Sequence, residues 1–420
     1  MIHEVLGGND LNGEQKLKDF ATSYLAKKVF VIDDDIIHFA NFGNSSCTAI
    51  IGDHSVILID AVRSSLYAKQ VREILAEYTD KPVRTIIYTT ILPETQGGSA
   101  VFADTVEQVI GCTENVRPRI ARTRLNDVKD MRKIFTKGYG LADKLIIPDG
   151  NTRQELITSF ETSRDEWLKP TLWIENNCSM EIDGVQLSLL RTPGETPETI
   201  TVWLPEKKAA AVGSLFYGTF PNFNIVTGSD YMETEIWCDS LRLVRDLEPE
   251  VLLPAMTVPV TGREEVRETL ETFADALEYI LIHTLDGIND GRTLDEIIAS
   301  VTLPDSFQKW YLQERYGRVE WMIRAIWTRN MGWFSGLAAE LTPLPDASFH
   351  DELIQLIGYE KLTQRIEQAL SDGEYQLALQ LCELDPRRYR NQKKRSLSRL
   401  GKESDCLGER YFMLARAEEL

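Results

Sequence analysis

Residues Val83 to Gly98, V-R-T-I-I-Y-T-T-I-L-P-E-T-Q-G-G, decide how the rest of the chain is organised. The apolar and β-branched run from Val83 to Ile87 predicts a buried strand. After it come a polar turn, Gly97 and Gly98, and then residues 99–103, whose composition predicts a helix. Where a strand passes into a helix, both elements direct backbone polar groups at one place, so the turn is a candidate site. Taken alone, the same residues fit an ordinary connection between a strand and a helix better.

The turn resembles the metal-binding turn of the metallo-β-lactamase fold, in the form that its alkyl sulfatase branch has. In that branch a strand runs into T-H-x-H-x-D-H-x-G-G, and here Thr89 and the paired glycines match the two ends of the motif. The three histidines and the aspartate of the motif fall on residues of other types: Thr90, Leu92, Thr95 and Glu94. Zinc binds imidazole nitrogen, thiolate or carboxylate, so among these four only the glutamate offers a ligand group.

The second half of the chain resembles the same branch at three further places. The segment R-T-P-G-E-T-P matches the family's P-G-x-E-A-P with one residue deleted, which places Glu195, or alternatively Glu198, at a metal-binding glutamate. The family's next acidic ligand falls on Gly213-Ser214, and its two closing histidines fall on Met256 and Thr257. In L-F-Y-G-T-F-P-N-F-N-I-V-T-G the family's asparagine and glycine are kept as Asn222 and Gly228, whereas the expected arginine is Thr227.

The resemblance therefore implies the scaffold without most of its metal ligands. Of the seven ligand positions, Glu195 keeps its type and Glu94 keeps its charge. Two carboxylates without imidazole partners could hold Mg²⁺ or Ca²⁺ weakly, but they do not make a dinuclear zinc centre. Because a two-metal hydrolase needs both ions in place, we expect no metal ligands, no cofactor and no conventional sulfate-ester hydrolysis.

Composition limits the classes of partner and compartment. The net charge of −19 would repel a phosphate backbone, so we expect no nucleic-acid partner. No apolar run approaches the ~20 residues of a membrane span, and the N-terminus lacks the pattern of a secretory signal. The six cysteines include no C-x-x-C pair, which is typical of a reduced cytoplasm. None of the five histidines lies within four residues of another, so a histidine site would have to be assembled from distant segments.

The fold class expected from these patterns is α/β, with an αββα metallo-β-lactamase-like sandwich followed by an all-α, tetratricopeptide-like dimerisation domain. We expect a peripheral segment at 1–28, the sandwich at 29–262 and the helical domain at 263–420, which implies a homodimer. A long charged insertion at 113–169 resembles the segment that covers the cleft of alkyl sulfatases, and a solvated surface excursion explains it equally well. The chain ends before the family's sterol-carrier-like domain, which we therefore do not expect.

The helical region resembles the family through Q-E-R-Y-G-R-V-E-W and the turn G-W-F-S-G at 332–336. Arg318, Arg324 and Arg329 follow a nearly helical spacing and would ordinarily flank a core that contains Trp321 and Trp327. A minority interpretation turns Arg318 toward the cleft as an anion clamp. The basic run at 387–395 is more typical of an exposed helix face than of a nucleic-acid site in so acidic a chain.

Three functions fit the sequence, in this order. The first is a metal-independent enzyme that acts on a small organic, biosynthetic substrate, with Glu94 and Glu195 as general acid and base in an apolar pocket. The second is a catalytically inactive pseudoenzyme kept as a dimeric binding or scaffold protein. The third is a hydrolase with an unusual metal site that recruits a distant residue such as Asp60. The residues expected to contact the ligand are Thr90, Leu92, Thr95, Gln96, Tyr217, Asn222, Met256, Thr257 and Arg318.

Overall fold

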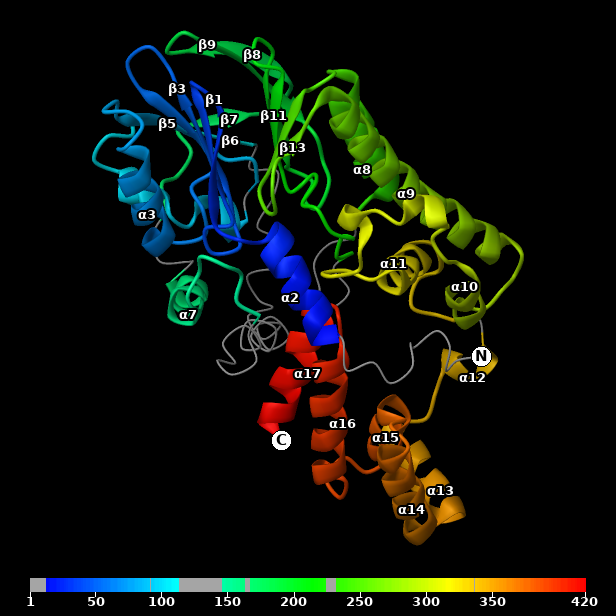
Figure 1. Ribbon diagram of the computed structural model, residues 1–420. Coiled ribbons are helices and arrows are strands. Elements are labelled where there is room, and N and C mark those ends of the chain that lie inside the picture. Colours follow the sequence, from blue (N-terminus) through cyan, green and yellow to red (C-terminus); the bar gives the residue numbers. More distant parts are fainter. Residues whose placement is uncertain (1–12, 91, 113–145, 163–166, 224–231, 336) are drawn as a thin grey trace.

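Two β-sheets packed face to face, with helices on both outer surfaces, make up the first large unit (Figure 1). The computed structural model describes residues 13–90, 92–112, 146–162, 167–223, 232–335 and 337–420. This is the predicted αββα sandwich, and the C-terminal part is helical, as expected. Within the described residues no helix has both the length and the apolar character needed to cross a membrane.

The first sheet has its strands in sequence order, antiparallel from β1 to β4 and parallel from β4 to β7. Its members are β1 (Lys28–Asp33), β2 (Ile36–Ala40), β3 (Cys47–Ile51), β4 (Val56–Ile59), β5 (Val83–Ile87), β6 (Gln108–Cys112) and β7 (Leu172–Ile174). Strands β1 and β2 form one hairpin, and β3 and β4 form another. The parallel step from β4 to β5 crosses over through helix α3 (Ser65–Leu75), which covers the outer face of this sheet.

The second sheet is ordered β13-β12-β11-β10-β9-β8, with β11 and β12 parallel and the other neighbours antiparallel. Its members are β8 (Cys178–Ile182), β9 (Val185–Arg191), β10 (Ile200–Leu204), β11 (Ala209–Gly213), β12 (Val251–Pro254) and β13 (Val260–Thr261). The turn between β8 and β9 is Asp183-Gly184, and both residues have the positive φ that is typical of a two-residue hairpin turn, +50° and +79°. Helices α8 (Thr234–Asp246) and α9 (Arg263–Asn289) cover its outer face (Figure 1).

Strand periodicity divides the apolar side chains among three layers of core. Between the two sheets lie side chains from both of them, such as Ile57, Ile87 and Val202. The alternate residues of the first sheet, such as Ile86, pack with α3. On the far side Trp237 of α8 belongs to a cluster with α9 and α11. Strands β4 and β10 are buried along their whole length, because other layers of the fold pack against both of their faces.

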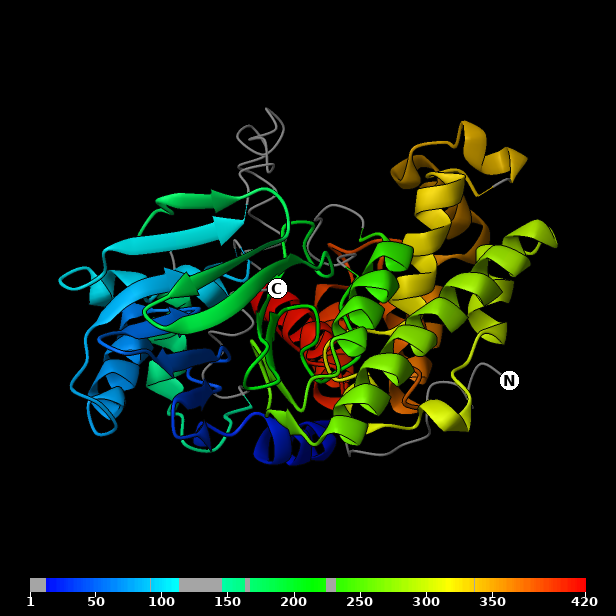
Figure 2. The same ribbon diagram turned by 90° about the horizontal axis from the view of Figure 1, so that it is seen from above.

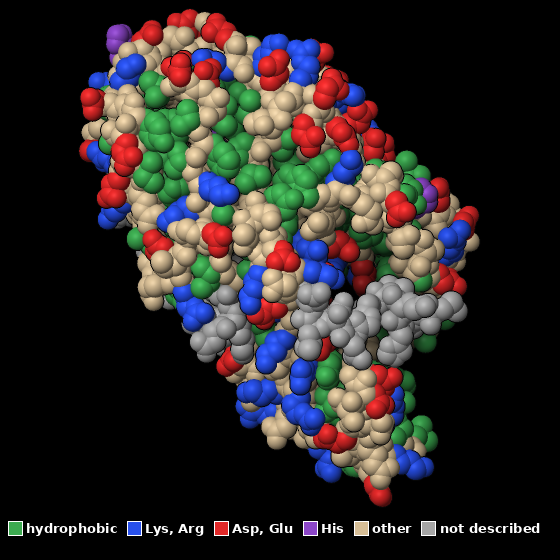
Figure 3. Space-filling model, in the orientation of Figure 1, with side chains coloured by type: hydrophobic (Ala, Val, Ile, Leu, Met, Phe, Trp, Pro, Cys, Tyr) green, Lys and Arg blue, Asp and Glu red, His purple; other side chains and the backbone are tan. Residues whose placement is uncertain are grey.

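The helical part follows α9 and folds back beneath the sandwich. It comprises α10 (Leu294–Ser300), η2 (Asp305–Phe307), η3 (Trp310–Leu312), α11 (Val319–Met331), α12 (Ala338–Leu341), α13 (Asp346–Ile357), α14 (Tyr359–Ser371), α15 (Tyr375–Cys382), α16 (Arg390–Glu403) and α17 (Leu407–Glu419). Seen from above, the C-terminal helices lie under the middle of the molecule (Figure 2). Lys and Arg gather over α16 and α17 (Figure 3), where several of them form ion pairs, among them Lys393 with Glu383.

The N-terminal helix α2 (Gly13–Tyr24) lies against the C-terminal helices. The Arg410 guanidinium of α17 is almost fully buried and binds the Glu14 carboxylate of α2 at 2.8 Å. A side chain at Gly13 would meet the carbonyl oxygen of Glu403 at 2.0 Å, so glycine is what permits this close approach. Residues from opposite ends of the sequence are therefore held together.

Three sequence predictions need revision or stay open. The helix expected at 99–103 is a short 3₁₀ turn, η1 (Ser99–Phe102), which follows the single-turn helix α4 (Pro93–Gln96). Most of the insertion expected as a lid, 113–145 and 163–166, lies outside the described residues. Its described part includes helix α7 (Arg153–Thr162), which lies beside α3. The domain boundary at 263 remains a prediction, and α9 shares a core with α8.

Candidate functional site

The ends of β5 and β11 and the beginning of β10 meet at one place. The Ile200 amide at the start of β10 donates to the Thr89 carbonyl just beyond β5, at 2.9 Å. Gly213 at the end of β11 has φ +54°, and a Cβ there would lie 2.4 Å from the Thr89 hydroxyl oxygen. The turn after β5, the turn before β10 and the loop after β11 are therefore neighbours, although they are far apart in the sequence.

Asp60 holds Thr89, the second residue after the end of β5, in place. Its carboxylate accepts hydrogen bonds from the Thr89 amide at 2.8 Å and from the Thr89 hydroxyl at 2.7 Å. Burial raises the pKa of Asp60 to about 7, although these two hydrogen bonds act to lower it. The N-cap of α3 is Ser64, so Asp60 does not cap that helix. Asp60 supports Thr89, which borders the site.

The turn that contains Thr90, Leu92, Thr95 and Gln96 is held by its own side chains. The Thr95 hydroxyl donates to the carbonyls of Thr90 and Leu92, both at 2.9 Å. The Gln96 amide donates to the Thr90 carbonyl at 3.2 Å, and the Leu92 amide donates to the Thr90 hydroxyl at 3.1 Å. The residues predicted to contact a ligand here therefore shape the turn, and Leu92 is the half-buried apolar member.

Glu94 is part of the same turn, and its side chain forms an ion pair with Arg63. The two side chains are 26% and 12% exposed, so the pair is largely desolvated. The Arg63 backbone is fixed in turn, because its amide donates to the Ser45 hydroxyl at 2.9 Å. The second carboxylate oxygen of Glu94 is buried and has no hydrogen-bond partner among the described residues. Arg63 was not predicted, because a loop arginine separated by 31 residues from Glu94 carries no local signal.

Glu195 lies in the turn before β10 and faces Glu94. Burial and the Glu94 charge raise the pKa of Glu195 to about 8; the Glu198 charge adds to this, and the Ser214 hydroxyl opposes it. Glu198, the alternative to Glu195 in the sequence, is 3% exposed, so both glutamates belong to one cluster. Among the described residues, Glu198 Oε1 is buried and has no hydrogen-bond partner. Gly194 makes the close packing possible, since a Cβ there would meet the Trp237 indole nitrogen at 3.1 Å.

Two tyrosines stand beside the carboxylates. Tyr217 is fully buried in the loop after β11, and its hydroxyl accepts a hydrogen bond from the Asn222 amide at 3.2 Å. The ring of Tyr316 lies edge-on to that of Tyr217, with centroids 6.0 Å apart. Burial raises the pKa of both hydroxyls, and the Glu195 charge raises both further. Tyr217 and Asn222 were expected at the site, whereas Tyr316, from the segment Q-E-R-Y-G-R-V-E-W, was not.

Met256 and Thr257 lie beyond β12, next to the loop that carries Tyr217. A side chain at Gly218 would meet the Thr257 hydroxyl oxygen at 2.6 Å. Thr257 has φ +68° and is held by Asn41, whose side-chain oxygen accepts from its amide at 2.9 Å. Met256 packs against the apolar cluster of the second sheet and its helices. These two residues border the same loop, and Asn41 secures them.

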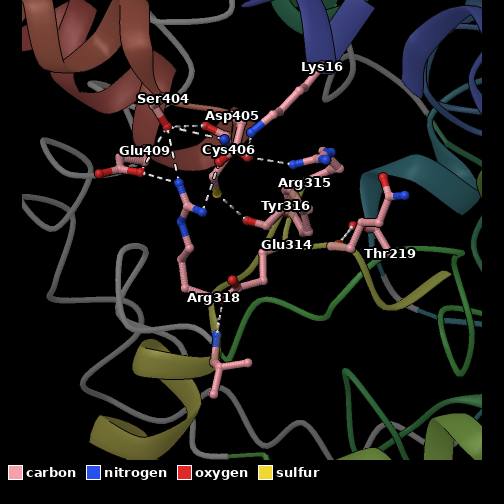
Figure 4. A network of polar contacts seen from close by, with 12 residues as sticks. Lys16, Thr219, Glu314, Arg315, Tyr316, Arg318, Ser404, Asp405, Cys406 and Glu409 are labelled. Carbon is pink, nitrogen blue, oxygen red and sulfur yellow. Dashed lines mark hydrogen bonds and ion pairs between the residues drawn. The ribbon is translucent and has the colours of Figure 1, made fainter. Parts of the chain in front are cut away.

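Arg318, which was predicted to contact the ligand, is engaged elsewhere. Its guanidinium binds Asp405 at 3.0 Å and Glu409 at 2.6 Å, both next to or within α17 (Figure 4). Two acidic groups of the same chain therefore neutralise this arginine. The interpretation of Arg318 as an anion clamp receives no support from these contacts, and Arg63 is the arginine beside Glu94.

The donor chemistry of the site differs from that of a zinc centre. Among the described residues, no three His, Cys, Asp or Glu side chains are grouped so that they could hold a metal ion. Glu94, Glu195 and Glu198 supply carboxylates, and one of them already has a guanidinium partner. Zinc in hydrolytic sites is held by histidines together with carboxylates, so this set of residues does not fit it.

The chain resembles a family profile and several known proteins in sequence. A sequence profile described as alkyl sulfatase dimerisation matches residues 293–420. A linear primary-alkylsulfatase from Pseudomonas sp. is 29% identical over 385 residues, which cover 87% of this chain and 72% of that protein. An alkyl/aryl-sulfatase from Saccharomyces cerevisiae is 22% identical over 413 residues, 93% of this chain and 64% of that protein.

The fold agrees with these matches in sequence. The structure of a stereoselective inverting sec-alkylsulfatase from Pseudomonas sp. superposes with a TM-score of 0.82 at 20% identity. The superposition covers 99% of this chain and 69% of the other. The chain is therefore similar in sequence and in fold to the alkyl sulfatase branch of the metallo-β-lactamase superfamily, and residues 293–420 match the dimerisation profile of that branch.

Proposed function

We propose that the chain is a metal-independent enzyme that acts on a small organic molecule, with Glu195 as its general acid or base. The observation that carries this proposal is the ion pair of Arg63 and Glu94. It places a guanidinium group beside the turn where the family's metal-binding motif stands.

The chemistry available to Glu195 is proton transfer. A carboxyl group with a pKa near neutrality exists in both protonation states, so it can give a proton to a substrate and take one back. The neighbouring guanidinium would stabilise negative charge that develops on a substrate oxygen. Cyclisation, elimination or isomerisation in a biosynthetic route requires these two functions and no metal. We assign the proton transfer to Glu195 and the anchoring of Arg63 to Glu94.

The polar atoms around Glu195 indicate the kind of ligand. Glu94 Oε2 and Glu198 Oε1 are buried without a partner among the described residues. Buried polar atoms in native proteins nearly always have a hydrogen-bond partner, so a ligand that donates hydrogen bonds would complete this set. The rings of Tyr217 and Tyr316 add an apolar surface beside it. We therefore propose a substrate with hydroxyl or amino groups on an organic framework.

Assembly and compartment follow from other features. We propose a homodimer, since a dimerisation profile matches 293–420. A reduced compartment such as the cytoplasm is supported by the six cysteines, which form no disulfides with one another.

The test is elemental analysis of the full chain, purified without added metal or chelator, together with hydrolysis of a primary alkyl sulfate. We expect substoichiometric transition metal and no hydrolysis. A stoichiometric transition metal with sulfate release would overturn the proposal in favour of a hydrolase with an unusual metal site.

A compound screen by thermal shift completes the test. Hydroxyl- and amino-bearing compounds should raise the melting temperature of the wild type but not that of E195Q, with E206Q as the matched control. Glu206 is an exposed glutamate in the turn between β10 and β11. If no compound distinguishes E195Q from the wild type, the chain is better described as a scaffold protein.

A further inference from the structure

The segment 313–318, between η3 and α11, carries Tyr316 to the candidate site. It is joined on one side to the loop that holds Tyr217. The Phe220 amide and the Thr219 hydroxyl donate to the Gln313 carbonyl at 2.9 and 2.7 Å. The Gly317 amide donates back to the Phe220 carbonyl at 3.0 Å. The two loops are thereby paired through their backbones.

Gly317 determines how closely the two loops approach. A Cβ at this position would lie 1.9 Å from the Pro221 carbonyl oxygen, a distance that backbone cannot relieve without moving the loop. The approach places the Tyr316 ring 6.0 Å from that of Tyr217 and within hydrogen-bond reach of the Asn222 side chain. Tyr316 also lies near enough to Glu195 and Glu94 for both charges to raise the pKa of its hydroxyl. It therefore faces the carboxylates proposed to act on the substrate.

The opposite side of segment 313–318 is bound to α17 and the turn before it (Figure 4). The Arg315 guanidinium binds Asp405 at 2.7 Å, and the Arg318 guanidinium binds Asp405 at 3.0 Å and Glu409 at 2.6 Å. Backbone contacts join the ion pairs: the Leu407 amide donates to the Arg315 carbonyl at 2.7 Å. The Cys406 thiol donates to the carbonyl of Tyr316 itself at 3.3 Å.

These ion pairs are of the kind that contributes to stability. The side chains of Arg315, Arg318 and Asp405 are between 14% and 24% exposed, so the charges are partly withdrawn from water. Removal of one member of a desolvated pair leaves the partner charge uncompensated, which costs more than loss of an exposed pair. Arg318 carries the larger share, since a planar guanidinium can bind two acids at once.

We infer that α17 and the turn before it complete the candidate site by holding Tyr316 against the carboxylates, with Tyr316 as a ligand-contacting residue and Arg318 as its positioning residue. This inference rests on the proposed function for the identity of the site. The segment that carries Tyr316 and the turn that holds it both lie within 293–420, the part matched by the dimerisation profile. That region thus supplies a residue to the site as well as a surface for assembly.

The experiment places 3-fluorotyrosine at position 316 of the full chain and follows its ¹⁹F resonance. In the otherwise native protein the resonance should be single and displaced from its value in denaturant. E195Q should displace it, because the glutamate lies beside the ring. R318M should move it toward the denatured value, because the segment loses its contact with Glu409 and one of its two contacts with Asp405, and R318K should move it less.

The matched control is R324M. Arg324 forms an exposed pair with Glu320 on the same helix, with side chains 40% and 48% exposed. Its loss should leave the resonance in place. A circular dichroism melt checks that each variant folds, and the double variant D405N/E409Q tests the same contact from the other side if R318M does not fold.

Two results would overturn the inference. If R318M and D405N/E409Q fold and leave the resonance unmoved, α17 does not position Tyr316. If E195Q leaves it unmoved, Tyr316 does not face Glu195. Neither result depends on metal content or on a substrate, so failure here is distinct from failure of the proposed function. Conversely, a stoichiometric zinc content would change the function and leave this positioning intact.

Discussion

At the scale of single residues, Arg63 gives Glu94 and Glu195 different electrostatic environments. Both were predicted as acid and base, yet the guanidinium binds Glu94, and in the described part of the chain Glu195 has no cationic partner. Two carboxyl groups in different environments can take different roles, one charged and one proton-exchanging. The asymmetry arises from a residue of the loop before α3 that no local motif marks.

Stability should depend on pH through Glu195. The folded state holds its proton up to a pKa of about 8, whereas the ordinary value is 4.5, so the folded state binds more protons between these values. The contribution is therefore fully present below about pH 4.5 and is lost as the pH rises to about 8. Between pH 6 and pH 8 the loss should be about 1 to 2 kcal/mol, after a discount for the partial exposure of Glu195.

The check is the melting temperature of wild type and E195Q at pH 6 and pH 9. Glutamine has no proton to lose, so relative to the wild type the variant should gain about 2 to 4 °C on going from pH 6 to pH 9. E206Q, on an exposed turn, serves as control and should follow the wild type. Parallel curves for E195Q and wild type would mean that the carboxyl is not desolvated.

At the scale of elements, local sequence patterns predicted the strands and turns, and they could not predict which loops meet. The β5 strand, the hairpin turn at Asp183-Gly184 and the parallel crossover through α3 follow from apolar periodicity and turn chemistry, which are local. Glu195 and Glu198 were both identified because one short motif contains them. Tyr316 joins them only through the backbone pairing of two distant loops, and that pairing has no signature in either loop alone.

Gly213 is the element-scale feature on which the site geometry depends most directly. In G213A the new methyl group would meet the Thr89 hydroxyl oxygen at 2.4 Å, in a backbone conformation with φ +54° that side chains disfavour. We expect a loss of stability of about 2 to 4 kcal/mol and a displaced β5 turn.

The matched control is G291A. Gly291 also has a positive φ, +74°, but a Cβ there meets nothing within 4 Å. It should cost about 1 kcal/mol from backbone strain alone. Chemical denaturation of both variants measures the difference, and equal losses would show that the contact with Thr89 does not matter.

At the scale of the whole molecule, apolar side chains are exposed along residues 331–359. Helices α13 to α15 extend away from the sandwich (Figure 1). Trp333 is 75% exposed, Leu344 62% and Leu356 82% in the isolated chain. Apolar exposure on this scale is typical of a surface that another protein covers.

We predict that a second copy of the chain covers this surface. W333D/L356D should convert a dimer into a monomer, because two buried charges would replace two apolar contacts. Light scattering coupled to size-exclusion chromatography, over a range of concentrations, measures the mass. I236D is the control, since Ile236 is an exposed apolar residue of α8 at 47%. A dimeric double variant, or a monomeric wild type, would contradict the prediction.

The ion pairs between Arg318 and α17 also set an order of events during protein synthesis. Arg318 leaves the ribosome 87 residues before Asp405. At roughly 5 to 20 residues per second, the delay is about 4 to 17 s. During that interval the nascent sandwich can pair its strands, but segment 313–318 has neither Asp405 nor Glu409 to bind. A ribosome that stalls in this interval would carry a sandwich whose strands can pair. Its site would not bind substrate fully until α17 is synthesised, because Tyr316 is not held in position before then.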